Sequence, residues 1–404
     1  MSVPETTANG SLPGAAGNTA ASKRSLFGRF NIIVGIIFVI GLWLTYRRFT
    51  GGLSAVTNLD NNNPWGIWIG FDLLCGVALA AGGYTTAAAV EIFGMKKFHA
   101  ALRPAILTGF LGYSMVVLAL LYDVGQPWRL PYPFFVSQGV TSVMFEVGAC
   151  VLLYLTVLFL EFSPIALEWL GQKRLRRVVV RLTLLLTILG VLLSTLHQSS
   201  LGALFLIAPS KLHPLWYSLY LPVFFFVSSI AAGLSMVIFE GTLAGRSFAD
   251  KMDEEHKKSV NDIVLGFGKG ASMVLAAYFT IKVFGVALGN HWRLLATGYG
   301  AWFLLEILGF VLLPCIVFAV GVRDKNVRLI RWTAFWTVIG IMLNRLNVVW
   351  IAFNWQLPAS ERYIPHWMEL GISVFVITLG LTIYRFIVTR MPVFYEHSDY
   401  RETH

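Results

Sequence analysis

Charged residues are scarce in this chain, and that scarcity excludes a water-soluble globular fold. Asp, Glu, Lys and Arg make up 13% of the 404 residues, whereas soluble domains have about 25%. Hydrophobic residues reach 56%, and the mean hydropathy is +0.69. We therefore expect an integral membrane protein rather than an enzyme of the cytosol.

Cysteine is equally scarce. The three cysteines, Cys75, Cys150 and Cys315, lie inside apolar stretches and form no Cys-x-x-Cys pair. Iron–sulfur clusters and structural zinc sites need several thiolate or imidazole ligands at short spacings. The chain is therefore expected to hold no iron–sulfur cluster or metal of its own, and the cysteines are interpreted as packing residues.

Histidines are missing where a membrane haem would need them. A bis-histidine haem requires two imidazoles that face one another within the helices, and of the eight histidines only His197 falls in an apolar stretch. We therefore expect no b-type haem. Two interpretations of His197 stay open: it donates to a quinone carbonyl or relays a proton near neutral pH, or it forms a helix–helix hydrogen bond.

The apolar residues are grouped in long runs. A helix needs about 20 apolar residues to cross a bilayer, and ten such stretches are predicted, which gives an all-α polytopic membrane fold. The N-terminal residues 1–29 and the C-terminal residues 391–404 are predicted to be tails, the first of them flexible, around one membrane domain at 30–390. The ten stretches are 30–46, 65–93, 103–123, 140–162, 178–199, 217–243, 260–283, 297–320, 330–351 and 367–388.

The basic residues indicate the topology. The formal net charge is +10, but most of the Lys and Arg residues lie in the N-terminal tail and in the loops after the even-numbered stretches, such as Lys173, Arg174, Arg176 and Arg177. Cytoplasmic loops of membrane proteins carry this excess. Both termini are therefore predicted to be cytoplasmic. The connection at residues 122–139, which we call the corner, then faces the periplasm or cell exterior. No nucleic-acid partner is expected.

The chain contains an internal repeat. Arg181, Thr183, Thr187 and Gly190 recur 150 residues later as Arg331, Thr333, Thr337 and Gly340, and Gly125-Gln-Pro-Trp-Arg-Leu resembles Gly289-Asn-His-Trp-Arg-Leu. Glu146 and Glu306 are each followed by Val-Leu-Leu at the same spacing. These matches predict a parallel duplication of a four-helix unit, residues 64–200 and 217–350 (helices 2–5 and 6–9), with the first and last helices added.

Polar residues gather in the predicted outer half of the membrane. Ionisable groups are expensive in hydrocarbon and suggest function, so the set predicts a polar pocket or a proton route, with a structural ion-pair network as the alternative. Trp128 and Arg129 flank the mouth of the corner, where an indole can stack on a flat ring. The outer-half residues are Asp72, Asp123, Glu146, His197, Lys282, Glu306, Arg345 and Glu369.

Several short motifs resemble one membrane protein family. The chain is similar to the polysulfide-reductase (NrfD-like) membrane subunits, and within them to the HybB type of membrane-bound nickel–iron uptake hydrogenases. The resemblance covers about residues 30–390. It rests on Asn63-Pro-Trp-Gly with Asp72, Asp123-Val-Gly-Gln-Pro-Trp-Arg, Thr195-Leu-His-Gln-Ser-Ser-Leu-Gly-Ala-Leu-Phe, Lys211-Leu-His-Pro-Leu-Trp-Tyr and Asn344-Arg-Leu-Asn.

The resemblance implies a haem-free, quinone-reactive subunit of the bacterial inner membrane. Its partners would be a ferredoxin-like iron–sulfur subunit on the outer face and the large and small hydrogenase subunits, and its substrate would be menaquinone or ubiquinone. Carried over to this sequence, Trp128 and Arg129 line the quinone headgroup site and Asp123 orders the corner. Trp65 and Arg345 are further candidates for quinone binding, and Asp72, Glu146 and His197 donate hydrogen bonds or protons.

Two other function classes remain open from the residues alone. Duplicated helices and intramembrane charges also occur in ion and solute transporters, although neither half shows an obvious pair of helices broken by Gly or Pro. A purely structural anchor is the third interpretation. Within the NrfD-like family, quinone chemistry coupled to proton pumping in another respiratory oxidoreductase is a further alternative.

Overall fold

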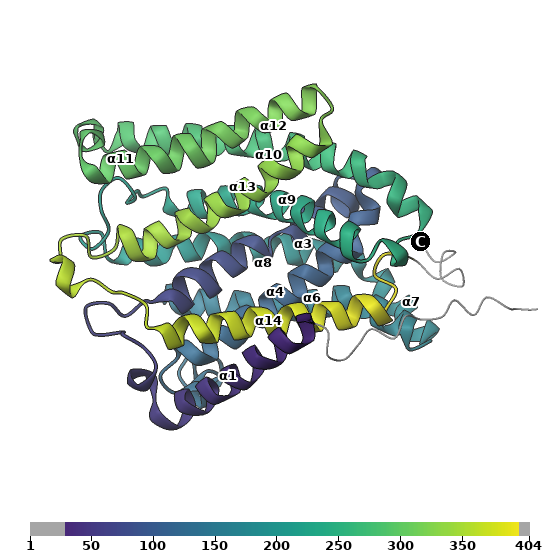
Figure 1. The fold of residues 1–404 in the computed structure, drawn as a ribbon, viewed down its shortest axis with the longest axis horizontal. Helices are drawn as coiled ribbons and strands as arrows, with labels where there is room; N and C mark the ends of the chain where they lie inside the picture. Colours follow the sequence, from purple (N-terminus) through teal and green to yellow (C-terminus); the bar gives the residue numbers. More distant parts are fainter. Residues whose placement is uncertain (1–28, 396–404) are drawn as a thin grey trace, which may run out of the picture.

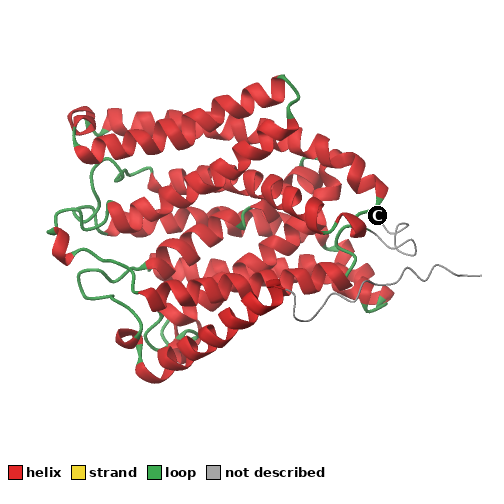
Figure 2. Ribbon diagram, in the orientation of Figure 1, coloured by secondary structure: helices red, strands yellow, loops and turns green. Residues whose placement is uncertain are grey.

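The computed structural model describes residues 29–395, and this part of the chain is almost entirely helical (Figures 1 and 2). It contains ten helical segments long and apolar enough to cross a membrane. The predicted fold class and the number of spans are confirmed. The spans are Phe30–Gly51, Trp68–Ile92, Lys96–Asp123, Val143–Trp169, Thr183–Ile207, Leu221–Ser247, His256–Leu288, Gly298–Arg323, Val327–Ile351 and Trp367–Arg390.

The second to fifth spans form one four-helix bundle, which we call the first bundle. The second span consists of η2 (Trp68–Cys75), α2 (Gly76–Leu79), α3 (Gly82–Ala87) and η3 (Ala88–Ile92), and the other three are α4 (His99–Asp123), α6 (Val143–Trp169) and α8 (Thr183–Ala203). Each helix packs on the next, and α8 returns to α3 and η3. A short helix, α7 (Lys173–Arg181), connects α6 to α8.

The sixth to ninth spans form the second bundle with the same order of contacts. Its helices are α9 (Leu221–Ser247), α10 (Glu254–Leu288), α11–η9–α12 (Gly298–Arg323) and α13 with η10 (Val327–Ile351). Contacts run from α9 to α10, α12, α13 and back to α9, and α9 joins the bundles through α3 and α8. The arrangement is the one expected of a parallel duplication, which itself remains a prediction from the repeat.

The first and last spans lie outside both bundles. The α1 helix (Arg29–Gly51) packs on α14 (Trp367–Arg390), which also contacts α4 and η2 (Figure 1). Helix α1 is longer than predicted, so Arg47 and Arg48 belong to its last turns rather than to a loop. Helix α6 begins at Val143, which places Glu146 in its first turn instead of two turns in.

Glycines bring the two bundles into direct backbone contact. A Cβ atom on Gly233 of α9 would lie 2.7 Å from the carbonyl carbon of Ala81 and from the nitrogen of Gly82. Side chains larger than hydrogen would therefore force α9 away from the second span. The segment that begins at Ala80, Ala-Ala-Gly-Gly, consists of small residues, which permit such close helix packing in membranes.

Four π-helical segments interrupt the spans, which the sequence did not lead us to expect. They are η2, η3 (Ala88–Ile92), η9 (Leu305–Leu312) and η10 (Asn347–Ile351). Asp72 lies in η2, Glu306 in η9, and Asn347 begins η10. Single-turn π segments occur often at functional sites, and here they lie beside the buried polar groups.

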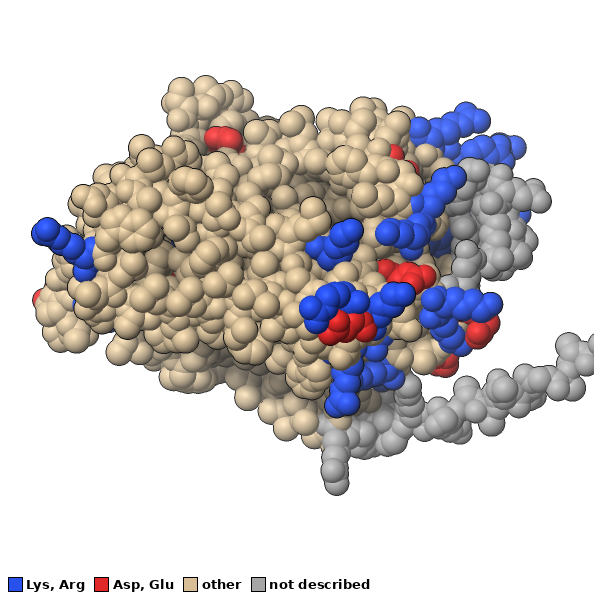
Figure 3. Space-filling model, turned by 90° about the horizontal axis from the view of Figure 1, so that it is seen from above, with Lys and Arg blue, Asp and Glu red and all other residues tan. Residues whose placement is uncertain are grey.

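The two ends of the molecule differ in charge. One end, which we call the basic end, carries α7 and the loops near residues 94–98, 248–253 and 324–326; Figure 3 shows Lys and Arg gathered toward one end of the face in view. The other, the corner end, carries residues 124–142 and 352–366. The predicted tails lie outside the described residues except at their edges, where Arg29 begins α1 and Val393 and Phe394 are buried.

Candidate functional site

The predicted corner is held by an arginine that the sequence did not single out. Arg48 of α1 donates from Nε to the carbonyl of Tyr122, 2.6 Å away, and from Nη2 to that of Val124, 2.8 Å away. These bonds satisfy carbonyls at the end of α4, where a helix leaves them unpaired. Arg48 therefore fixes the direction in which the chain leaves the membrane.

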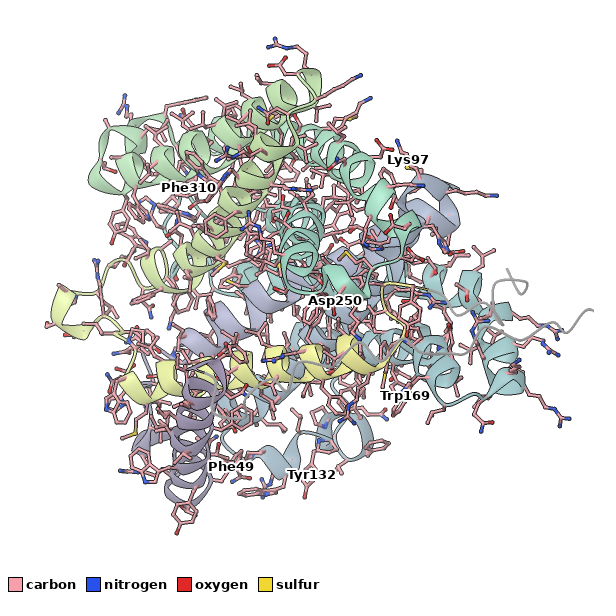
Figure 4. The ribbon with its side chains drawn as sticks, turned by 45° about the vertical axis from the view of Figure 1, so that its right-hand side comes forward. Phe49, Lys97, Tyr132, Trp169, Asp250 and Phe310 are labelled. Carbon is pink, nitrogen blue, oxygen red and sulfur yellow. The ribbon has the colours of Figure 1, made fainter. Side chains whose placement is uncertain are left out.

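Trp128 and Arg129, the predicted headgroup residues, lie on the surface of this corner. The Trp128 side chain is 68% exposed, and the Arg129 guanidinium lies 5.7 Å from the ring centre of Tyr132. Figure 4 labels Tyr132 near the edge of the molecule. Both residues are therefore exposed, and they do not share a pocket with the predicted carboxylates.

Asp72 lies in a ladder of contacts between η2 and α14, which we call the α14 junction. The Trp68 indole donates to the carbonyl of Glu369, 3.1 Å away, and one turn later the Ser373 hydroxyl donates to Asp72, 2.5 Å away. All four residues are buried. The junction thus holds a carboxylate in the membrane with a single hydroxyl donor among the described residues.

Asp123 belongs to the same junction. It follows Tyr122, whose ring lies 6.3 Å from that of Trp68, and its nearest charged neighbours are Arg48 and Glu369. Its Oδ1 atom is buried and accepts no hydrogen bond from a described residue. Buried polar atoms without partners are rare in native structures and call for an explanation.

The third carboxylate of the junction, Glu369, is fully paired. It accepts hydrogen bonds from the backbone of Asn58 at 3.0 Å and of His366 at 2.9 Å, and from the Tyr363 hydroxyl. Burial and the bond to Glu369 raise the pKa of Tyr363, which lies in the loop before α14, well above its ordinary value. Tyr363 therefore remains a neutral donor, and Glu369 is a structural anchor.

His197 is enclosed in the first bundle. Its Nε2 atom is bonded to the Tyr113 hydroxyl of α4 and its Nδ1 atom lies 2.7 Å from the carbonyl of Leu193, while the ring of Tyr154 stands 5.5 Å away. The helix–helix hydrogen bond, one of the two interpretations of His197, is present. Both imidazole nitrogens therefore have protein partners.

Glu146 lies apart from His197, at the exposed corner-end turn of α6. The carboxylate accepts a hydrogen bond from the Ser200 hydroxyl of α8, 2.5 Å away, and the residue is otherwise open to the surroundings. A carboxylate in this position can exchange protons with the outside far more readily than one in the helix interior.

Glu306 is the centre of a polar cluster inside the second bundle. Its side chain is 1% exposed and accepts hydrogen bonds from the Trp216 indole at 2.8 Å, from Asn344 at 2.6 Å and from Asn347. Arg345 continues the cluster, with bonds to Asn344, the Phe225 carbonyl and the Ser228 hydroxyl at 2.8–3.0 Å. The cluster is well satisfied, as expected of a buried polar network.

Lys282 completes this cluster. It is 3% exposed, its ammonium lies 5.0 Å from the ring centre of Phe224 and 5.6 Å from that of Phe303, and the carboxylate of Glu306 attracts its charge. A cation over aromatic faces is stabilised by their quadrupoles. Glu306 and the aromatic faces therefore partly offset the two positive charges of Lys282 and Arg345 in the interior.

The structure thus divides the predicted residues among five places rather than one pocket. Asp72 and Asp123 share the α14 junction, His197 and Glu146 lie separately in the first bundle, Arg345 lies in the second, and Trp128 and Arg129 lie on the corner. Trp65 packs its ring 5.3 Å from Phe205 and 5.4 Å from Phe353. The partners that the sequence did not indicate are Arg48, Tyr113, Tyr154, Trp216, Tyr363 and Ser373. The two asparagines that donate to Glu306 belong to the Asn344-Arg-Leu-Asn motif, which the sequence did single out.

The comparisons with known proteins identify the family. A model described as "Polysulphide reductase, NrfD" matches residues 55–355, which is most of the chain. The match begins before the second span and ends after the ninth, so it includes both bundles.

Relatives match the chain over nearly their whole length. A protein of Nitratidesulfovibrio vulgaris is 65% identical over 385 residues, which cover 95% of this chain and 99% of the relative. The "Probable Ni/Fe-hydrogenase 2 b-type cytochrome subunit" of Escherichia coli is 32% identical, with 90% and 91% covered. The "Menaquinone reductase, integral membrane subunit" of N. vulgaris is 27% identical, with 93% and 95% covered.

Proposed function

The chain belongs to the NrfD polysulphide reductase family, and from this premise we propose that it is the integral membrane subunit of a respiratory oxidoreductase that reduces quinone. In this proposal, electrons reach it at the corner end from a ferredoxin-like iron–sulfur subunit, which is fed by the large and small subunits of a nickel–iron hydrogenase. Menaquinone or ubiquinone accepts them, and the complex resides in the bacterial inner membrane with both termini of this chain in the cytoplasm.

The observation that carries the proposal is the pair of carboxylates at the α14 junction. Asp72 has one hydroxyl donor and Asp123 has a buried oxygen without a described partner, whereas Glu369 beside them is fully paired. Groups intended only for packing are normally satisfied. The incomplete pairing supports a role in binding or protonating a ligand.

The reaction balances with these residues as proton carriers. A quinone takes up two electrons from the iron–sulfur partner and one proton on each of its two oxygens to become the quinol. Asp72 and Asp123 are proposed to deliver protons at the junction, and Glu146, exposed and bonded to Ser200, to exchange them with the surroundings. A carboxyl relay of this kind is effective when its pKa lies near the operating pH.

The remaining candidates are assigned supporting roles. Trp128 and Arg129 are exposed at the corner, where we propose that they complete the headgroup site once the partner subunit covers them. His197, held by Tyr113, orients that part of the first bundle or relays a proton. Trp65 and Arg345 are proposed to shape the walls of the quinone site, as packed neighbours rather than proton donors.

We further propose that this chain works without haem, although the E. coli relative is called a b-type cytochrome subunit. The support is the engagement of both His197 nitrogens, since an axial ligand needs a free imidazole nitrogen. Absorption spectra of the purified, reduced complex test this point, and an α-band that disappears in the His197→Gln variant would overturn it.

The test of the proposed function is hydrogen-dependent reduction of a menaquinone analogue in membranes with and without this chain. Hydrogen-dependent dye reduction serves as the control for the soluble partners. We expect quinone reduction to require the chain and to fall about tenfold or more in Asp72→Asn and Asp123→Asn, with dye reduction unchanged. Quinone reduction that persists without the chain excludes the hydrogenase assignment and points to a different electron donor.

A further inference from the structure

A cavity of about 560 Å³ opens at the basic end of the first bundle. Its walls come from η3, α4, α6, α7 and the start of α8. Four arginines line it, Arg103, Arg176, Arg177 and Arg181, together with Glu91 and Glu161. None of the residues proposed for quinone chemistry contributes to this lining.

Two of the four arginines already have an acidic partner. Arg103 lies 3.0 Å and Arg176 3.6 Å from the carboxylate of Glu168. Arg177 and Arg181 are exposed, and no carboxylate of residues 29–395 forms an ion pair with them. They are one turn apart on α7, where like charges repel.

Helix α7 itself supplies no counter-charge. Its sequence, Lys-Arg-Leu-Arg-Arg-Val-Val-Val-Arg, holds five basic residues and no acidic one. An anion bound between Arg177 and Arg181 would remove the repulsion on this face. Guanidinium groups suit phosphate because they donate two parallel hydrogen bonds to its oxygens.

Apart from its charged residues, most of the cavity lining is apolar, which favours a lipid over a free phosphate ion. Leu102, Ile106, Ile165 and Val180 line it below the arginines. Such a wall adds nothing to the binding of a small hydrated anion, but it fits the glycerol and upper acyl carbons of a phospholipid.

Helix α7 also has the composition of a helix that lies among lipid headgroups. Leu175, Val178 and Leu182 share one side of this segment and are 45–54% exposed, as are Leu184 and Leu185 at the start of α8. Apolar side chains beside a row of arginines are typical of a helix that lies in the membrane interface. Basic pockets between helices at this depth bind anionic headgroups.

From this combination we infer that the cavity binds the phosphate headgroup of an anionic phospholipid, with Arg177 and Arg181 as its main ligands. The inference is independent of the proposed quinone chemistry, because it concerns other residues at the other end of the molecule. A lipid here would tie α7 to η3 and α4 and thereby brace the first bundle.

The experiment compares two double variants with equal loss of charge in the purified full-length protein. Arg177→Gln/Arg181→Gln removes the two cavity ligands, whereas Arg174→Gln/Arg328→Gln removes two exposed arginines that do not line the cavity. Native mass spectrometry measures binding of dioleoylphosphatidylglycerol, with dioleoylphosphatidylcholine and inorganic phosphate as the competing probes.

We expect phosphatidylglycerol to bind the wild-type chain and the control alike, and to bind the cavity variant roughly 30-fold more weakly, since each basic residue near the surface contributes about 1 kcal/mol. Equal weakening in both variants would overturn the inference in favour of general surface charge. Equal binding of phosphatidylcholine, or binding of inorganic phosphate that excludes the lipid, would also overturn it.

Discussion

The two bundles place corresponding glutamates in opposite environments. In the first, Glu146 is exposed and has one donor, Ser200; in the second, Glu306 is buried and has three donors. The position that holds His197 in the first bundle holds Asn347 in the second, and only Asn347 turns to the glutamate. Two similar bundles thus hold one carboxylate that is buried and fully hydrogen-bonded, Glu306, and one that is exposed and has a single donor, Glu146.

The contrast suggests a division of labour. In the second bundle the buried polar groups of the Glu306 cluster form hydrogen bonds with one another, so this cluster stabilises the fold. The first bundle and the adjoining α14 junction leave carboxylates only partly paired, so these are the groups that remain available for protons and quinone. Four changes test this division, beginning with the largest expected effect.

Glu306→Ala should be the most damaging change to the fold. It leaves the Trp216, Asn344 and Asn347 donors without an acceptor and Lys282 and Arg345 without their counter-charge, so we expect a loss of about 3–5 kcal/mol in the free energy of unfolding. Denaturant titration in detergent measures it. Glu146→Ala is the matched control, with an expected loss below about 1 kcal/mol; similar losses in both would refute the contrast between the bundles.

Tyr113→Phe tests the enclosed His197. Removal of the hydroxyl leaves a buried imidazole nitrogen without its partner, and the expected destabilisation is about 1–3 kcal/mol. Tyr46→Phe removes a hydroxyl from a side chain that is 68% exposed and should change stability by less than about 0.5 kcal/mol. If the two variants unfold at the same denaturant concentration, His197 does not depend on Tyr113.

Glu146→Gln should separate activity from stability. The amide keeps the contact with Ser200 but cannot take up and release a proton. We therefore expect about tenfold slower reduction of a menaquinone analogue. Assembly and hydrogen-dependent dye reduction should be unchanged. Glu306→Gln is the comparison. We expect it to lower the free energy of unfolding more than it lowers the turnover rate per folded complex. Normal turnover in Glu146→Gln would remove Glu146 from the proton route.

The smallest expected effect concerns pH and the loop that links the bundles. Burial, with a smaller contribution from the charge of His291, lowers the pKa of His213 from 6.5 to about 4, so between these pH values the unfolded chain binds a proton that the folded chain does not. Stability should therefore fall as the pH is lowered from 6.5 toward 4. His213→Asn should reduce this slope in thermal unfolding, whereas His291→Asn should largely retain it; an unchanged slope in His213→Asn contradicts the assignment.

The fold class, the ten spans and the family were accessible from the sequence because each depends on composition or on contiguous residues. Long apolar runs identify the spans. The motifs around Asp123 and His197, which indicate the family, each consist of contiguous residues.

The site was only partly predictable, since helix rotation decides which polar groups meet. Glu146 and Glu306 stand in the same local pattern, yet one faces outward and the other inward, and nothing in the flanking Val-Leu-Leu distinguishes them. The π segments at Asp72 and Glu306 shift the side chains by a fraction of a turn. Arg48 was assigned to a loop, although α1 continues past it to Gly51, and its bond to the corner was therefore not expected.

The α14 junction also has a consequence for how the chain is made. Ser373 and Glu369, the partners of Asp72 and Trp68, belong to α14, which is synthesised after both bundles. Until α14 inserts, Asp72 lacks its hydroxyl donor, Ser373. Helix α1 also lacks the helix on which it packs. Insertion of α14 is therefore the event that completes the site, and a chain released before α14 would contain both bundles but an unfinished α14 junction.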